Sequence, residues 1–284
     1  MRFNILVSAM ALSAGLVASP VFAQSAEQTG FNGIYVGGSF GASLQGNDGG
    51  SSISFDKNRD GTFGDTVLTS TNANGFGPGF CKGYAKGRTP DAGCDNDRDD
   101  IEYFGNIGFD KQTASGFVFG VVGEFGKSNI TDSVSAFSTT PHAYTMTREM
   151  KYNAGLRLRA GYTPNNTTLF YATGGGAYAK IKNRFNTTNN ASNTGNAFSD
   201  NGNSDAWGYS AGGGVEQKIS NNLSVGVQYL YTDLKDNDYR VTASRGTALA
   251  TNPFVIANAA GTDFRRSDEN FRFHSIRATA AFRF

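Results

Sequence analysis

Eight segments of the chain alternate between apolar residues and polar or small residues, which is the pattern of β-strands with two different faces. They are Phe31–Leu44, Ile101–Asp110, Gly116–Gly126, Met150–Tyr162, Thr168–Ile181, Trp207–Ile219, Leu223–Leu234 and Asn270–Phe284. Each is about as long as the roughly 9–11 residues that cross a bilayer as a tilted strand. The last segment predicts a strand at the very end of the chain, where most chains fray.

The connections between these segments alternate in length. Three are tight turns, with the sequences KQTAS, TPNNT and SNN. The other four are long and polar, over about residues 45–100, 127–149, 182–206 and 235–270. Long loops at one end and short turns at the other are typical of outer-membrane barrels. We therefore predict an all-β fold over residues 24–284, an eight-stranded antiparallel up-and-down transmembrane barrel with long extracellular loops and short periplasmic turns.

The composition of the two faces indicates which of them contacts lipid. In Met150–Tyr162, one face is wholly apolar or aromatic, from Met150 to Tyr162, and the other carries Lys151, Arg157 and Arg159. An eight-stranded interior is only just wide enough for side chains, so it could not hold all of the aromatic residues. We expect aromatic and aliphatic side chains toward lipid, and glycine, serine and charged side chains inside. A soluble ligand-carrying barrel, with the faces reversed, is the less favoured alternative.

The inward face, which is formed by every second residue of each strand, carries many charges. The inward residues are Glu102, Asp110, Glu124, Glu216, Lys151, Arg157, Arg159, Lys180, Lys218, Arg277 and Arg283. A buried charge without a partner costs about 3–5 kcal/mol, so we predict a charge network that blocks the lumen. Its members are Glu124, Arg157, Arg159, Arg277, Glu216 and Arg283. The alternative is a small anion-selective pore, left open by the inward glycines Gly174, Gly176, Gly212 and Gly214.

Composition and the N-terminus indicate an exported strand protein. The chain has 37 Gly, 23 Phe and 12 Tyr with only 17% charged residues, and its net charge of +1 gives no reason to expect nucleic acid as a partner. After the N-terminus, no stretch approaches the ~18 apolar residues of a spanning helix. Residues 1–23 read as a signal peptide cleaved after Ala23, because their apolar run is too short for a retained anchor. In an exported protein, the close pair Cys81 and Cys94 predicts a disulfide rather than two free thiols.

One loop resembles half of a calcium site. In DKNRDGTFGD, the residues Asp56, Asn58 and Asp60 hold positions 1, 3 and 5 of an EF-hand loop, and Gly61 holds position 6. Position 12 is Val67 instead of glutamate, so Asp65 would have to complete the site. The alternative is a solvated acidic turn, and we expect no other cofactor.

The sequence offers few candidate catalytic residues. The histidines are His142 and His274, and His274 is adjacent to Ser275, so a strand sends the two to opposite faces. Some outer-membrane enzymes that modify lipid use a His and a Ser two residues apart on one face. The spacing argues against that chemistry, and we do not expect an enzyme.

Four segments resemble the small outer-membrane β-barrel proteins of Gram-negative bacteria, the opacity-type porin or surface-antigen family. They are FNGIYVGGSFGAS, LFYATGGGAYAKI, GYSAGGGVEQKI and RATAAFRF. The resemblance covers all eight strands and leaves the loops outside. It implies an outer-membrane location, with Phe282 and Phe284 in a signal read by the barrel-assembly machinery. It also implies contacts with lipid and lipopolysaccharide, and with periplasmic chaperones during biogenesis. The role expected is envelope-structural and surface-exposed, with at most a narrow or gated pore; a loop-mediated adhesin or receptor is the alternative.

Overall fold

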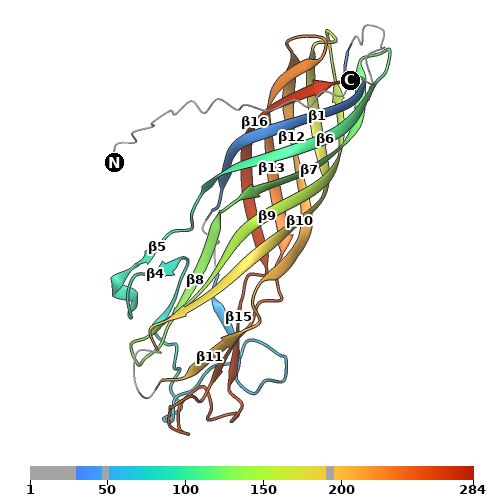
Figure 1. The fold of residues 1–284 in the computed structure, drawn as a ribbon. Helices are drawn as coiled ribbons and strands as arrows, with labels where there is room; N and C mark the ends of the chain where they lie inside the picture. The colour runs from blue at the N-terminus through green and yellow to red at the C-terminus, as the bar shows by residue number, and fades with distance from the viewer. Residues whose placement is uncertain (1–29, 47–50, 190–194) are drawn as a thin grey trace.

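A computed structural model of the chain describes residues 30–46, 51–189 and 195–284, and eight of its strands close into an antiparallel barrel (Figure 1). These strands are β1 (Gly33–Leu44), β6 (Asp100–Gln112), β7 (Phe117–Ser128), β9 (Ala143–Tyr162), β10 (Thr168–Thr187), β12 (Ser204–Lys218), β13 (Leu223–Lys235) and β16 (Asn270–Arg283). The predicted all-β, eight-stranded fold is confirmed. The predicted signal peptide lies outside the described residues. No helix in the described ranges has the length and apolar character of a membrane span.

The last strand is held along both of its edges. β16 pairs with β1 from Tyr35↔Arg283 to Leu44↔His274, and with β13 on its other side. The Phe284 backbone N–H donates to the Ile34 carbonyl oxygen at 3.0 Å. Because every strand of a closed barrel has two neighbours, no backbone edge is left to face lipid.

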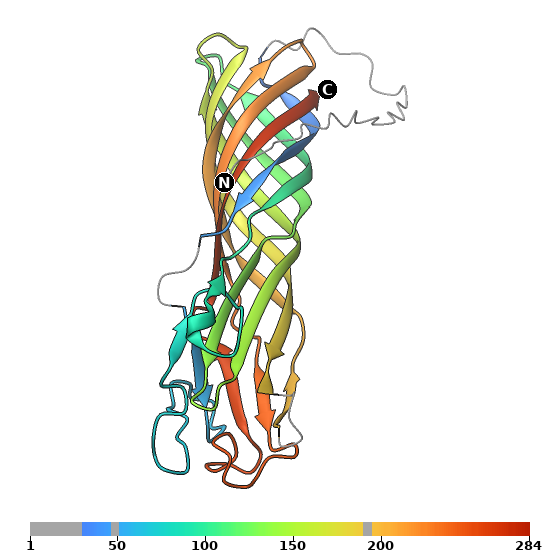
Figure 2. The same ribbon diagram turned by 90° about the vertical axis from the view of Figure 1, so that its left-hand side faces the viewer.

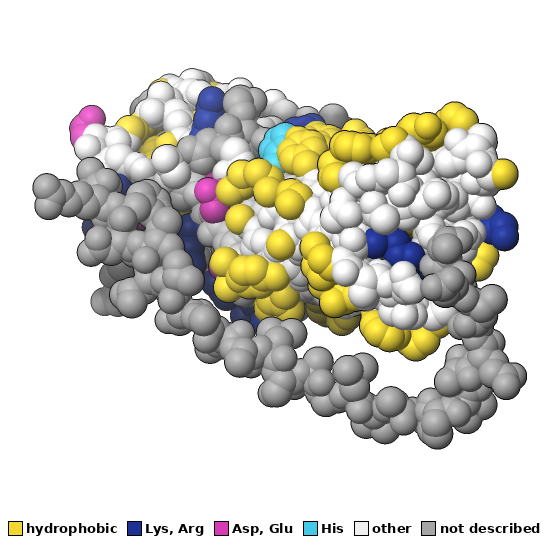
Figure 3. All heavy atoms as spheres, turned by 90° about the horizontal axis from the view of Figure 1, so that it is seen from above, with side chains coloured by type: hydrophobic (Ala, Val, Ile, Leu, Met, Phe, Trp, Pro, Cys, Tyr) yellow, Lys and Arg dark blue, Asp and Glu magenta, His cyan; other side chains and the backbone are white. Residues whose placement is uncertain are grey.

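Large apolar side chains cover the outer wall of the barrel. Leu158 is 70% exposed, Trp207 68% and Leu156 64%. Figure 3 shows apolar side chains gathered on this wall. Aromatic residues mark both ends of the band: Phe109, Phe117, Tyr162, Phe282 and Phe284 near the short turns, and Tyr103, Tyr152 and Trp207 at the other end. An apolar band of this extent far exceeds the patches of soluble monomers, so the outer wall is a lipid-facing surface.

The long connections form a β-structured head that continues the barrel beyond this band (Figure 2). Four short strands make a second sheet in the order β11-β14-β15-β2, namely β11 (Ala197–Asp200), β14 (Val241–Ser244), β15 (Thr262–Arg266) and β2 (Ile53–Asp56). Another strand, β8 (Thr131–Phe137), pairs with the extension of β9 and with β3 (Gly79–Cys81). A side hairpin consists of β4 (Tyr84–Ala85) and β5 (Cys94–Asp95), with a 3₁₀ turn at Pro90–Ala92 between them.

The head has an aromatic core, which corrects the expectation of simply polar loops. Phe55 stacks on Phe76 with ring centroids 4.3 Å apart, and Tyr144, Phe254 and Phe264 pack around them. All five side chains are at least 96% buried. These residues lie in separate short stretches that are mostly polar, apart from Phe254 beside Val255 and Ile256, so hydrophobic periodicity gives no sign of this core.

A β-bulge reverses the inward parity of β9 and corrects one assignment. The register shifts because Lys180 pairs with Tyr152 while Ile181 pairs with Met150, which leaves Lys151 as the extra residue. A bulge residue moves all following side chains to the opposite face. Met150, predicted on the lipid face, is therefore fully buried inside, and Lys151 lies one-third exposed at the bulge.

Three residues of β10 predicted inside face outward instead. Lys180 pairs with the exposed Asp205. Gly174 and Gly176 share the parity of Phe170, which is 52% exposed. Both faces of this segment carry Gly and Ala, so alternation in the sequence does not distinguish them.

Candidate functional site

The barrel interior contains two layers of ion pairs, of which the upper is nearer the head. In this layer, both nitrogens of the Arg157 fork donate to Glu124 at 2.6 and 2.7 Å. Arg277 donates from Nη1 to Glu124 at 3.0 Å and from Nε to Glu102 at 2.6 Å. The Ser275 hydroxyl also donates to Glu102, at 3.0 Å. The two arginines and two glutamates thus pair mainly with one another and with neighbouring hydroxyls, while Arg157 Nε is buried without a hydrogen-bond partner among the described residues.

The lower layer, nearer the short turns, repeats this arrangement. Arg283 donates to Asp110 at 2.8 Å and to Glu216 at 2.7 Å. Arg159 donates to Glu216 at 2.7 Å and lies 3.4 Å from Asp110. Below it, Phe31 is fully buried and its ring lies 5.0 Å from the Arg283 guanidinium carbon. Phe31 precedes β1, so it fills the mouth of the barrel at the short turns rather than continuing the strand as predicted.

Strand pairing explains why these residues meet. Glu124 on β7 and Arg157 on β9 have the same inward parity on paired strands, and Arg277 reaches them from β16 across the lumen. All six members of the predicted network lie in the lumen, but in two layers: Glu124, Arg157 and Arg277 in the upper, and Arg159, Glu216 and Arg283 in the lower. Glu102 and Asp110 complete it; parity placed both inside, and only the register shows that they are direct partners of Arg277 and Arg283.

Little free space remains between the two layers. The cavity there has a volume of about 40 Å³, lined by residues of both layers and by Tyr35, Asn106 and Thr173. A water needs about 10–15 Å³ of such volume, so the cavity accommodates only a few waters. Aromatic rings also cover the guanidinium groups, as with Phe104 at 4.0 Å from Arg277.

Above the charged layers, the interior becomes apolar. The members of this layer are Ile130, Met150, Ala179, Ile181, Ala206, Leu234, Phe271 and Phe273, all at most 1% exposed. Their side chains come from five barrel strands and from the loop after β7. They separate the lumen charges from the head.

A third group of charges lies at the base of the head. Asp132 accepts hydrogen bonds from Arg148 at 2.7 Å and from Arg266 at 2.6 Å, and all three side chains are buried. Burial opposes ionisation of Asp132, but the two guanidinium groups outweigh it and hold the pKa of the carboxyl below its usual range. Sequence analysis missed this group because regular alternation places Arg148 on the lipid face, with Met150, whereas the bulge at Lys151 turns both side chains inward.

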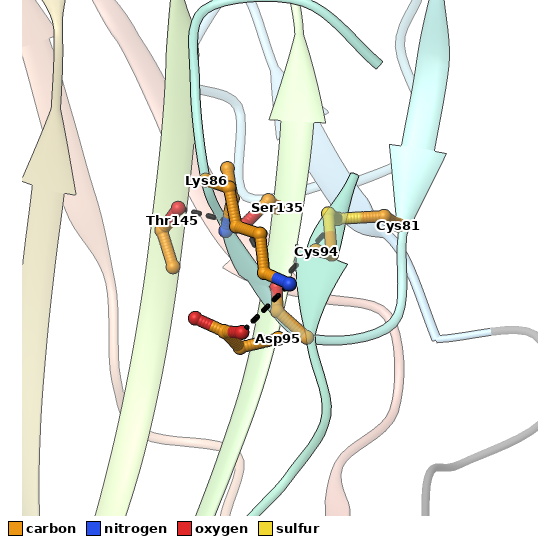
Figure 4. Close-up of a disulfide and its surroundings, with 8 residues drawn as sticks. Cys81, Lys86, Cys94, Asp95, Ser135 and Thr145 are labelled. Atoms are coloured by element: carbon orange, nitrogen blue, oxygen red, sulfur yellow. Dashed lines mark hydrogen bonds and ion pairs between the residues drawn. A yellow bond between two sulfur atoms is a disulfide. The ribbon is translucent and has the colours of Figure 1, made fainter. Parts of the chain in front are cut away.

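Cys81 and Cys94 form a disulfide that fastens the side hairpin to the head (Figure 4). Ser135 on β8 lies beside it, where its hydroxyl accepts a hydrogen bond from Ala85 N at 3.0 Å. An exposed ion pair joins Lys86 to Asp95 at 3.0 Å. The disulfide therefore fastens the hairpin to β3, and the hydrogen bond to Ser135 holds it against β8.

The residues of the predicted calcium loop lie in the turn after β2, where backbone groups occupy their oxygens. Asp56 accepts from Gly61 N at 2.8 Å, and Asp65 accepts from Lys57 N at 3.0 Å. Among the described residues, no group of three or more Asp, Glu, His or Cys side chains is placed to hold a metal ion. The arrangement does not support calcium ligation by Asp56, Asn58, Asp60 and Asp65.

The predicted separation of His274 from Ser275 is confirmed. Ser275 is fully buried in the lumen, whereas His274 lies on the outer wall, with Nδ1 2.7 Å from the Tyr229 hydroxyl. His142 lies in the head, 3.4 Å from the Thr188 hydroxyl. These positions do not assemble a His–Ser pair on one face of a strand.

Two curated proteins match the chain in sequence, and no protein-family model matches it. Both are described as a 31 kDa outer-membrane immunogenic protein, one from Brucella melitensis biotype 1 and one from Brucella suis biovar 1. Each is 35% identical over 127 residues, which cover 45% of this chain and 51% of the relative. The match thus spans about half the length of these relatives. Together with the closed barrel, it confirms the resemblance to outer-membrane proteins of Gram-negative bacteria.

Solved structures show a more distant similarity. The outer membrane protein OprG from Pseudomonas aeruginosa aligns over 92% of this chain and 99% of its own, with 11% identity and a TM-score of 0.48. The outer membrane protease OmpT from Escherichia coli aligns over 89% of this chain and 97% of its own, with 9% identity and a TM-score of 0.38.

Proposed function

We propose that the chain is a closed envelope barrel that displays a rigid head at the cell surface, rather than an enzyme or an open pore. The observation that supports this is the filled lumen, where Arg157, Arg159, Arg277 and Arg283 are each paired with carboxylates and are at least 93% buried. An apolar layer then separates these charges from the head.

The proposal includes an orientation and a route of assembly. Short turns of such barrels face the periplasm and long loops face outward, so the head is extracellular. The chain is exported by its N-terminal signal peptide and folded with periplasmic chaperones and the barrel-assembly machinery, which reads the terminal phenylalanines. Lipid and lipopolysaccharide of the outer membrane surround the finished barrel.

Liposome swelling tests the absence of a pore. Proteoliposomes that contain the folded wild-type protein should swell in small sugars or amino acids no faster than protein-free liposomes. Wild-type swelling comparable to that of a known porin would contradict the proposal. Surface labelling of the head on intact cells, which does not depend on the lumen, tests the orientation separately.

A second candidate function is recognition of a surface partner by the head. A groove of about 540 Å³ lies between β4, the end of β10 and β11, and it combines aromatic and polar side chains, among them Tyr84, Phe198, Asn186 and Asp200. The Brucella relatives are described as immunogenic, which fits a surface-exposed head. In an adhesin, the double substitution Phe198→Ala and Asp200→Ala should abolish cell attachment and leave barrel assembly intact. Unchanged attachment would count against this role.

A further inference from the structure

A second groove lies on the lipid-facing wall, directly below the head. Its volume is about 550 Å³, and its lining consists of Tyr103, Gly105, Phe125, Gly126, Lys127, Lys151 and Tyr152. Tyr103, Phe125 and Tyr152 are 53%, 61% and 38% exposed, so the groove opens toward the bilayer. It spans three adjacent strands, β6, β7 and β9.

A missing side chain produces the hollow. Gly105 has the same outward parity as Tyr103 and Ile107, and in the ladder it lies opposite Phe125. A Cβ added at Gly105 would meet no atom within 4 Å. The backbone therefore does not require glycine for space there, and a larger side chain would fill the groove without a clash.

Two ammonium groups lie at the end of the groove nearest the head. Lys127 pairs with Tyr103 in the ladder, is exposed, and forms no ion pair within the described part of the chain. Lys151 reaches the same groove because the bulge of β9 places it there, and it contacts Glu149. Glu149 is also shared with Arg184 at 2.7 Å.

The surface beside the groove is also basic. Lys182 pairs with Glu149 in the ladder, next to Arg184 two positions further along β10. Glu149 interacts with the three cations Lys151, Lys182 and Arg184, and Lys127 adds a fourth positive charge at the rim of the groove. An apolar slot in the bilayer with excess positive charge at its upper end complements a lipid whose head group carries phosphates.

We propose that this lysine-rimmed groove binds a lipid of the outer leaflet with the chemistry of lipid A, one acyl chain against Gly105 and a phosphate between Lys127 and Lys151. The inference rests on the outer-membrane orientation proposed above, which puts the rim at the outer leaflet. The aromatic rings of Phe125 and Tyr152, 5.7 Å apart, form one wall for the chain. The lysines bind the phosphate as point charges, so a head group with two phosphates gains most.

Native mass spectrometry of the folded full-length protein in detergent tests the proposal. The added lipids are lipid A with two phosphates, dephosphorylated lipid A, and phosphatidylglycerol as the anionic phospholipid. The wild type should retain lipid A with two phosphates most strongly. Retention should fall about tenfold or more in the double variant Lys127→Gln, Lys151→Gln, and in Gly105→Leu.

Matched controls exist on the same wall. Lys111, exposed at the other end of β6, lies at the opposite membrane interface, so Lys111→Gln should retain lipid A like the wild type. Gly176→Leu adds an outward side chain on β10, also with no atom within 4 Å of its Cβ, and should be equally neutral. The shift in gel mobility on heating shows which variants are folded.

Two results would overturn the inference. One is undiminished lipid A retention in both the double lysine variant and Gly105→Leu. The other is phosphatidylglycerol retention as strong as that of lipid A, which would show a general anionic surface instead. Neither result depends on whether the lumen conducts, so the proposed closed barrel is tested separately, by liposome swelling.

Discussion

At the scale of the residue, strand parity predicted the lumen charges and failed where the backbone departs from regular alternation. Counting residues from the short turns predicts Glu124, Arg157 and Arg277 at one level of the lumen. This prediction succeeds because β7, β9 and β16 are regular near the membrane centre. Met150 and Arg148 were misplaced or missed because a bulge has no clear signature in a single sequence. Sequence thus gives the faces of strands, and the register of one strand against the next decides the partners.

Replacing Glu124 by alanine should destabilise the barrel. The change leaves Arg157 without a carboxylate and removes one of the two partners of Arg277, and an uncompensated buried charge costs about 3–5 kcal/mol. The midpoint of heat-induced mobility change in detergent should fall. The control is Lys86→Gln, which breaks the exposed pair with Asp95 and should change stability by about 1 kcal/mol or less. Equal midpoints for Glu124→Ala and wild type would refute the layer's structural role.

At the scale of the element, the strands that cross the membrane were predicted closely and those of the head were not. The predicted segment Leu223–Leu234, for example, is β13 at Leu223–Lys235. The head strands are two to seven residues long, and β2 pairs with β15, which lies far along the chain. Such short strands form through tertiary pairing rather than from a local pattern. For this reason, these ranges were predicted from the sequence as polar loops.

Removing the disulfide should loosen the head and leave the barrel unchanged. In Cys81→Ser with Cys94→Ser, the hairpin loses a cross-link that contributes roughly 3 kcal/mol to a closed loop of this size. Added protease should cleave within residues 79–95 faster than in the wild type, while the heat-induced mobility shift stays. Loss of the folded barrel in this variant would contradict a role confined to the head.

The head should lose stability in strong acid through Asp132. The pKa of its carboxyl is lower in the folded head than in the unfolded chain. Its ion pairs therefore stabilise the head fully at pH values above the ordinary Asp pKa of about 3.9, and this stabilisation is lost as the pH falls through the lower pKa of the folded state. Near-ultraviolet circular dichroism should stay constant from neutral pH to about pH 5 and diminish below the ordinary value. In Asp132→Asn, the signal should already be weaker at neutral pH, since Arg148 and Arg266 lose their shared anion. If the wild type and Asp132→Asn showed the same acid transition, the transition would have to arise from groups other than Asp132.

The end of β16 should matter for assembly. Phe282 and Phe284 face lipid with ring centroids 5.2 Å apart, and Phe284 also bonds to Ile34 through its backbone. Deleting Phe284 should lower the amount of folded protein in the outer membrane, measured by heat-modifiable barrel in membrane fractions. Lys111→Gln serves as a control at the same interface. Unchanged levels after the deletion would remove the assembly role from this residue.

At the scale of the whole molecule, the interior is a stack of alternating chemistry. From the short turns upward, it consists of Phe31 with Val118 and Leu169, two layers of ion pairs, an apolar layer, the Asp132 group and the aromatic core of the head. The outer wall is apolar between two aromatic girdles. A lumen filled in this way leaves little room for a solute, which is the basis of the proposed closed barrel.

Single-channel current recording in a planar bilayer tests this account most directly. The wild-type protein, inserted in its folded form, should show little or no steady conductance, because both ion-pair layers and the apolar layer lie across the lumen. Glu124→Ala, in any fraction that stays folded, should conduct more than the wild type, since it opens the upper layer. Steady, large, anion-selective channels from the wild-type protein would contradict the closed barrel.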